Sequence, residues 1–306
     1  MPDIEEAVQD LRTVRDFVRW GMSLFKAADL HHGHGMPSAL DEAAYLVLHA
    51  LHLPPDLHDS WFDVRLTHSE RRSVAALLAR RVRERLPAPY LTGEAWFAGL
   101  PFHVDQRVLV PRSPIAELIE NRFEPWVDST RVERILDLCT GSGCIAVACA
   151  AAFPDAAVDG SDISADALAV AAANVERHHM GGQVRLVQSD LFSELHGERY
   201  DVIVSNPPYV DAVDMAALPP EFRHEPQGAL AAGEDGLDLV RIILSQAADH
   251  LMPGGILVVE VGNSAAALEE AFPEVPFTWL EFERGEAEVF LLDAQQLQEY
   301  RALFAA

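Results

Sequence analysis

One stretch decides the fold, the run Ile135-Leu136-Asp137-Leu138-Cys139-Thr140-Gly141-Ser142-Gly143. Its first four residues are mostly apolar and predict a buried strand, and the apolar run 144–150 that follows predicts a helix. Glycine adopts positive φ and lets a ligand approach the backbone, so Gly141 and Gly143 predict a turn that can receive one. The third glycine of the dinucleotide fingerprint is absent, and the pattern alone also fits an ordinary strand-to-helix turn.

Beyond residue 113 the chain alternates between strand and helix patterns. Helices are predicted between most of the strands, and this alternation is typical of an α/β fold with a parallel sheet. The last two strands have no helix between them and are predicted to pair antiparallel at the end of the sheet. The predicted strands are 134–138, 156–161, 184–188, 202–205, 255–261, 277–282 and 288–292; the predicted helices are 115–123, 145–152, 165–178, 237–250 and 265–271.

The first 88 residues show helical patterns only. Apolar spacing predicts one helix over 4–27 and a second over 39–52. Thr67-His68-Ser69-Glu70 has the form of a capping box and opens a third helix that ends before Pro87. Residues 96–104 predict a hairpin around a glycine turn. The predicted domains are therefore a helical domain (1–88), a hairpin linker (89–112) and an α/β domain (113–306).

The 306-residue chain is strongly acidic, with a formal charge of −25. Residues 1–105 carry 15 acidic and 11 basic side chains, which leaves 33 acidic and 12 basic for residues 106–306, or net charges of −4 and −21. Such a surface repels phosphate backbones and attracts basic partners, although an acidic surface kept for solubility is an equal explanation. The charge weighs against a nucleic acid as the direct substrate.

Neither a membrane segment nor a metal site is predicted. No run of about 18 uncharged apolar residues is present, and the acidic N-terminus lacks the features of a secretory signal, so a cytoplasmic location is expected. Cys139, Cys144 and Cys149 lack the tight pairing of zinc ligands and are expected to behave as small buried hydrophobic residues. The histidines of the glycine-rich loop 31–35 are expected to form a flexible loop.

Acidic residues follow the next two predicted strands. Asp162 is placed where a carboxylate accepts both ribose hydroxyls of a nucleoside cofactor, although capping the following helix is the alternative. Asp190 is placed to accept from an adenine amino group, while Leu191 and Phe192 cover the ring. Together with the acid of the first strand, Asp137, these acids are expected to face one cleft at the carboxyl ends of the strands.

A second turn, Asn206-Pro207-Pro208-Tyr209, follows the predicted strand 202–205. An amide nitrogen shares its lone pair with its carbonyl and is a poor nucleophile. The Asn206 side-chain oxygen and the Pro207 carbonyl are able to accept both N–H hydrogens of a substrate amide, which favours charge on the attacking nitrogen. The prolines stiffen the loop without donating N–H, and Tyr209 is expected to pack on the flat substrate group. With the glycine turn, this pattern indicates methylation of a planar nitrogen.

These motifs resemble the class I S-adenosylmethionine-dependent methyltransferases, in the branch of protein N(5)-glutamine methyltransferases. Members of this branch modify a glutamine of the large-subunit ribosomal protein uL3 or of peptide release factors. The resemblance covers nearly the whole chain, and Ser113–Glu117, residues 90–97 and residues 214–226 are closer to the ribosomal-protein members. Further shared motifs are Leu109-Val110-Pro111-Arg112, Glu225-Pro226 with Ala229-Leu230, Gly233–Leu237, and Val258-Val259-Glu260-Val261-Gly262.

The resemblance implies a seven-stranded Rossmann-like sheet, S-adenosyl-L-methionine as cofactor, no metal, and a basic ribosomal protein as substrate. Alternatives are a release-factor enzyme, an adenine-N6 nucleic-acid methyltransferase, which should carry a basic groove, and a non-catalytic protein-binding module. The implied residues are Asp137, Leu138, Cys139, Thr140, Gly141 and Gly143 for the methionine end of the cofactor, Asp162 and Ile163 for the ribose, Asp190 and Leu191 for the adenine, Asn206 beside the cofactor, Asn206 through Tyr209 for the glutamine, and Arg112 and Glu225 for the substrate channel.

Overall fold

The computed structural model describes residues 3–284 and 287–304. It divides into two compact units, one formed by Met1–Glu94 with Pro219–His224 and the other by Ala95–Leu218 with Glu225–Ala306. By its contacts, the short segment Pro219–His224 therefore belongs to the helical unit although it lies far along the chain. Among the described residues, no helix has both the length and the apolar character needed to cross a bilayer.

The helical unit differs from the sequence prediction at its start. The helix predicted over 4–27 is two helices, α1 (Ile4–Asp10) and α2 (Val14–Ala27), because the backbone at Leu11 is extended and a capping box between Thr13 and Asp16 begins a new helix. The apolar spacing continues across the break, so periodicity alone did not reveal it. The other helices of this unit are α3 (Ala39–Ala50), η1 (Asp59–Asp63), α4 (His68–Glu84), α5 (Ala88–Thr92) and η2 (Pro220–His224).

A buried ion cluster lies inside the helical unit. Arg81 of α4 is 1% exposed, and its Nε lies 2.5 Å from Glu42 Oε1. Glu221, from the segment Pro219–His224, is fully buried, and its Oε1 lies 2.9 Å from Arg85 Nη2 and 3.7 Å from Arg81 Nη1. The capping box that begins α4, between Thr67 and Glu70, is confirmed. Because unpaired buried charge is costly, this cluster ties the distant segment to α4.

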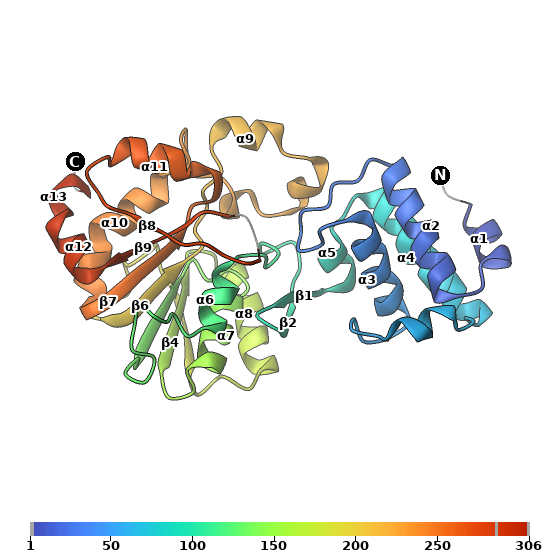
Figure 1. Ribbon diagram of the computed structural model, residues 1–306, viewed down its shortest axis with the longest axis horizontal. Helices are drawn as coiled ribbons and strands as arrows, with labels where there is room; N and C mark the ends of the chain where they lie inside the picture. Colours follow the sequence, from blue (N-terminus) through green and yellow to red (C-terminus); the bar gives the residue numbers. More distant parts are fainter. Residues whose placement is uncertain (1–2, 285–286, 305–306) are drawn as a thin grey trace. The chain divides into compact units, whose positions relative to one another are not determined.

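The other unit contains a seven-stranded sheet, which confirms the predicted fold class (Figure 1). The strand order is β5-β4-β3-β6-β7-β9-β8, and β9 runs antiparallel to both of its neighbours. The antiparallel pairing predicted for the last two strands is thus confirmed. The strands are β3 (Arg134–Leu138), β4 (Ala157–Asp162), β5 (Val184–Gln188), β6 (Tyr200–Ser205), β7 (Leu251–Glu260), β8 (Thr278–Trp279) and β9 (Val289–Asp293).

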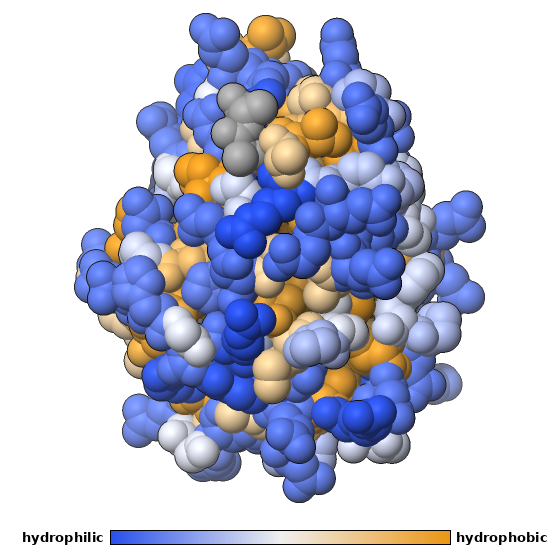
Figure 2. Space-filling view, turned by 90° about the vertical axis from the view of Figure 1, so that its left-hand side faces the viewer, coloured by the Kyte–Doolittle hydropathy of each residue, from blue (hydrophilic) through white to orange (hydrophobic). Residues whose placement is uncertain are grey.

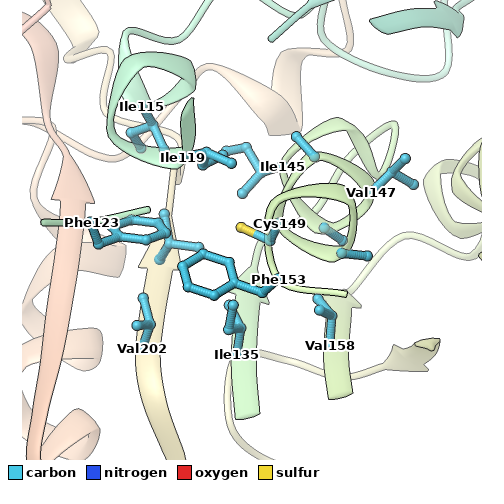
Figure 3. Packing of buried hydrophobic residues seen from close by; sticks show 14 of the residues in the cluster. Ile115, Ile119, Phe123, Ile135, Ile145, Val147, Cys149, Phe153, Val158 and Val202 are labelled. Atoms are coloured by element: carbon cyan, nitrogen blue, oxygen red, sulfur yellow. The ribbon is translucent and has the colours of Figure 1, made fainter. Parts of the chain in front are cut away.

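Helices cover both faces of this sheet because residues of each strand point alternately to opposite sides. Ile135 and Val202 pack with residues of α6 and α7, as Figure 3 shows, and the same cluster includes Val175 of α8. Leu136 and Ile203 pack instead with α10, α11, α12 and α13. The helices are α6 (Ile115–Glu120), α7 (Cys144–Ala152), α8 (Ala165–Arg177), α9 (Ala212–Ala217), η3 (Gln227–Ala229), α10 (Asp238–His250), η4 (Gly262–Ser264), α11 (Ala265–Ala271), α12 (Ala294–Glu299) and α13 (Arg301–Phe304); α9, α12 and α13 were not predicted.

The predicted hairpin is confirmed as β1 (Glu94–Phe97) and β2 (Leu100–His103), which form a separate two-stranded sheet. A buried amide connects β2 to the α/β core. Asn174 of α8 accepts from His103 N at 2.7 Å, and its Nδ2 donates to His103 O at 3.0 Å and to Ser142 O at 2.8 Å. Asn174 is fully buried, so the hairpin, α8 and the turn after β3 share one polar anchor.

The strand order positions the site. After β3 the chain adds β4 and β5 on one side and then returns to place β6 on the other side of β3. In open α/β sheets, ligands bind outside the carboxyl ends of the strands where the order reverses in this way. That point lies between β3 and β6, and the two predicted turns, which begin at Cys139 and Asn206, follow directly from these strands.

Candidate active site

A cavity of about 490 Å³ lies at the carboxyl ends of the central strands. It receives residues from the turns after β3, β4, β5 and β6, which confirms that these turns face a common space. The predicted residues that line it are Arg112, Cys139, Thr140, Gly141, Asp162, Ile163, Asp190, Leu191, Asn206 and Pro208. The predicted residues that are not among its lining residues are Asp137, Leu138, Gly143, Phe192, Pro207, Tyr209 and Glu225. Phe192, predicted to cover the adenine ring, is buried and stacks on His250 instead.

The two glycines of the first turn have different roles. Gly141 has a φ of +55°, and a β-carbon built there would have no atom within 4 Å. Because Gly141 lines the cavity, its missing side chain leaves room for a ligand beside the backbone. Gly143 has a φ of +77°, and a β-carbon there would lie 3.0 Å from the Cβ and 3.2 Å from the Cα of Ala171. Gly143 therefore allows α7 to begin against α8, which differs from its predicted role in binding the cofactor.

Asp137 lies beneath this turn and is fully buried. Its Oδ2 accepts from Thr140 Oγ1 at 2.5 Å and from Ala146 N at 2.9 Å, so it fixes both the turn and the start of α7. Its Oδ1 is buried and has no hydrogen-bond partner. Burial raises the pKa of Asp137 to about 7, against the hydrogen bonds from Thr140 and Ala146. A cationic ligand near Oδ1 would stabilise the ionised carboxylate.

Asp162 ends β4 and joins the cavity to two loops. Its Oδ2 accepts from Gly141 N and its Oδ1 from Ser164 N, both at 2.9 Å. The alternative role considered for Asp162, capping α8, belongs to Ser164, whose hydroxyl accepts from Ala167 N at 3.2 Å. Burial raises the pKa of Asp162, and the hydrogen bonds from Ser164 and Gly141 oppose the shift. A carboxylate has about four lone-pair sites, so acceptor capacity remains for ribose hydroxyls.

The turn after β5 presents Asp190 and Leu191 to the cavity. Asp190 is exposed, whereas Leu191 is 6% exposed and has a φ of +46°. Ser189 holds this conformation because its hydroxyl donates to Leu191 O at 2.6 Å. Cys139, after β3, is also left-handed, with a φ of +64°. Left-handed non-glycine residues are costly and cluster at functional sites, and both of these line the cavity.

The Asn-Pro-Pro-Tyr turn places its first residue in the cavity. Asn206 follows β6, whose end is tied to β3 by a hydrogen bond of 2.6 Å from Ser205 Oγ to Leu138 O. Pro208 also lines the cavity, whereas Pro207 is buried within the loop. Tyr209 differs from its predicted contact with substrate. Its hydroxyl donates to Glu260 Oε1 at 3.0 Å, and a β-carbon at Gly262 would lie 2.5 Å from its ring.

Arg112 and Glu225 form an ion pair that holds the edge of the cavity. Arg112 donates from Nη1 to Glu225 Oε1 at 2.6 Å and from Nη2 to Oε2 at 2.9 Å. The same Oε1 accepts from Val110 N at 3.0 Å. Glu225 is buried and is not among the lining residues, so its role is to fix Arg112 and the chain around Val110.

Sequence reasoning missed several lining residues. Two stretches, 107–113 and 226–232, contribute to the cavity wall, although a site role had been predicted in them only for Arg112. The backbone of Val210 pairs with the second stretch, since Val210 N donates to Leu230 O at 2.8 Å and Ala232 N donates to Val210 O at 3.0 Å. Apart from the motif resemblance, no sequence signal identifies them, because they reach the site only through tertiary contacts.

Comparisons with known proteins agree with this geometry. The methyltransferase small domain family matches residues 123–233. The ribosomal protein uL3 glutamine methyltransferase of Bordetella pertussis is 52% identical over 290 residues, which is 94% of this chain and 97% of that protein. The enzyme of the same name from Xanthomonas campestris pv. campestris is 52% identical over 296 residues, 97% of this chain and 96% of that protein. The fold is similar to that of the hMettl16 catalytic domain, with a TM-score of 0.50, 19% identity and coverage of 72% of this chain and 80% of that one. This chain therefore belongs to the family of ribosomal protein uL3 glutamine methyltransferases.

Proposed function

We propose that this chain transfers a methyl group from S-adenosyl-L-methionine to the side-chain amide nitrogen of a glutamine in ribosomal protein uL3. The observation that carries the proposal is a single cavity that contains both Asn206 and the acidic turns expected to bind the cofactor. The names of the two relatives, which are 52% identical to this chain, support the same substrate.

The residues of the cavity fit the cofactor. Ligand pockets commonly enclose about 300–1,000 Å³, a range that includes the volume found here. The open space at Gly141 suits the close approach of a ligand to the backbone. Asp162 and Asp190 supply acceptors for hydroxyl and amino groups. When bound, S-adenosyl-L-methionine supplies an electrophilic methyl carbon on a sulfonium.

Asn206 would hold the substrate amide. Its side-chain oxygen accepts an N–H of the glutamine carboxamide, which orients the nitrogen and favours the positive charge that develops there. Pro207 and Pro208 limit the conformations of the loop, and the contact between Tyr209 and Glu260 anchors its far end. The loop therefore contributes mainly by positioning, which lowers the entropy cost of reaction.

The acidic α/β domain (113–306) would meet a basic protein substrate. Figure 2 shows a face of the molecule that is mainly hydrophilic, with apolar residues scattered between the polar ones. Complementary charge raises the rate of encounter between proteins. The N-terminal helical domain (1–88) and the hairpin linker (89–112) would select this substrate. The reaction would take place in the cytoplasm, where ribosomal proteins are made.

Mass spectrometry tests the proposal. Purified protein is incubated with S-adenosyl-L-methionine and, separately, with uL3, a peptide release factor or an adenine-containing oligonucleotide, and tryptic peptides or nucleosides are analysed. We expect one methyl group on a glutamine of uL3 only. Methylation of the release factor or of adenine in its place would refute the proposed substrate.

An Asn206→Ala variant tests the assigned site. It should bind the cofactor with unchanged affinity in calorimetry but lose methyl transfer, because only the amide-holding group is removed. Asn121→Ala, at an exposed position after α6, is the matched control and should keep full activity. Turnover by Asn206→Ala at the wild-type rate would contradict the role of Asn206.

A further inference from the structure

Glu260, the last residue of β7, is buried beside the Asn-Pro-Pro-Tyr turn and is 2% exposed. Tyr209 donates to its Oε1 at 3.0 Å, and Ser113 donates to its Oε2. The Asn206 side chain lies close enough to Glu260 to lower the pKa of its carboxyl. The strand register explains this proximity, because Ser205 of β6 pairs with Val259 of β7, so the residues that come next, Asn206 and Glu260, lie side by side.

The chemistry of these groups makes the contact directional. A carboxylate only accepts hydrogen bonds, whereas an asparagine side chain accepts at one end and donates at the other. A hydrogen bond between the two side chains must therefore use Asn206 Nδ2 as the donor. The Asn206 oxygen is then directed away from Glu260, and Asn206 lines the cavity.

We infer that Glu260 is a positioning residue that orients the Asn206 side chain so that its oxygen, and not its nitrogen, faces the substrate. The inference rests on the proposed function, because orientation matters only if Asn206 accepts from a substrate amide. With the amide reversed, its N–H₂ group would face the N–H₂ group of the substrate, and two donors repel.

The surroundings of Glu260 favour its role as an acceptor. Burial raises its pKa, while hydrogen bonds from Ser113 and Tyr209 and the charge of Arg112 favour the ionised form. Burial and the neighbouring Glu260 also raise the pKa of Tyr209, so the phenol remains a donor. Arg112 itself is held by Glu225, which keeps a positive charge near the buried carboxylate.

A simpler role for Glu260 is to hold Tyr209 and Ser113 in place. Variants that exchange the carboxylate at position 260 and the amide at position 206 distinguish the two roles. In Glu260→Gln, either end of the new amide is able to meet Asn206, so the Asn206 orientation is no longer fixed. In Asn206→Asp, two carboxylates meet and repel. In the double variant, the new amide at position 260 donates to the new carboxylate at position 206, and an acceptor oxygen faces the cavity again.

We expect Glu260→Gln to lower kcat at least tenfold while the dissociation constant of the cofactor changes less than twofold. The Asn206→Asp/Glu260→Gln double variant should be at least tenfold more active than Asn206→Asp. Ser113→Ala, which removes a different donor to Glu260, is the matched control and should lose less activity than Glu260→Gln. A double variant that is folded, binds cofactor and is no more active than Asn206→Asp would overturn the inference.

A second readout does not depend on turnover. The chain has four asparagines, so selective ¹⁵N-asparagine labelling gives four side-chain amide signals, and the one lost in Asn206→Asp identifies Asn206. A hydrogen bond to a carboxylate shifts one of its protons downfield, and this shift should disappear in Glu260→Gln. An unchanged signal would refute the proposed orientation. If the wild-type protein fails to methylate uL3 but the signal moves, the proposed function fails and the orientation stands.

Discussion

Alanine substitutions at Gly141 and Gly143 should separate the two glycines that the sequence presents as one motif. Both have left-handed backbones, so each substitution costs about 1–2 kcal/mol of conformational strain. Only at Gly143 does the new β-carbon contact Ala171 of α8, including its Cα at 3.2 Å. Overpacking of this kind costs about 1–3 kcal/mol. Gly143→Ala should thus destabilise the fold by about 2–5 kcal/mol, and Gly141→Ala by about 1–2 kcal/mol.

The effect on cofactor binding should be the reverse, with a larger loss of affinity in Gly141→Ala than in Gly143→Ala. The methyl group of Gly141→Ala projects into open space in the cavity and should weaken cofactor binding at least tenfold, whereas folded Gly143→Ala should bind nearly as well as the wild type. Urea unfolding gives the stability, provided that the m value is unchanged, and calorimetry gives the affinity. Equal destabilisation of the two variants would refute the close contact between position 143 and Ala171. Normal cofactor affinity in Gly141→Ala would refute the approach of the cofactor to Gly141.

The charged groups of the chain give three further predictions. Burial raises the pKa of Asp137 from 3.8 to about 7, so the folded chain keeps a proton that the unfolded chain releases. The contribution of Asp137 to the free energy of unfolding is complete below the unfolded pKa of 3.8 and is lost as pH rises through about 7. In a pH series of unfolding curves, the wild type should therefore lose stability over this range, and Asp137→Asn should lose less. Glu221→Gln leaves buried Arg81 undercompensated and should cost about 3–5 kcal/mol in urea unfolding, whereas Glu84→Gln, in a surface pair, should change stability by less than about 0.5 kcal/mol. Binding of uL3 should weaken as salt rises, because the acidic domain would attract a basic partner, and salt-independent affinity in a titration series would exclude electrostatic steering.

Much of the α/β architecture was accessible from sequence because local patterns and global fold agree there. The apolar strands, the helices between them and the two turns after β3 and β6 all carry strong local signals. The break between α1 and α2 lacked such a signal in the periodicity, because Val8, Val14 and Phe17 are all buried in the same core. The capping box at Thr13 was the available clue to the new helix start.

The functional site was predicted less completely, because residue order does not give side-chain direction. Asp137 belongs to the motif but lies beneath the turn, and Tyr209 follows the site residue but contacts Glu260. Glu260 is 54 positions beyond Asn206 in the chain and reaches it only because β6 and β7 are neighbours in the sheet. Contacts of this kind depend on strand order, which the sequence patterns left open.

The Asn174 anchor has a consequence for exchanging substrate-recognition domains between enzymes of this fold. A chimera joined at residue 113 would discard His103, and the Asn174 amide would lose two of its three hydrogen bonds. A junction at residue 95 keeps the hairpin strands with the core, so the Ser142 carbonyl in the glycine turn keeps its support. In such chimeras the hairpin should therefore stay with the catalytic domain and should not be exchanged with the recognition domain.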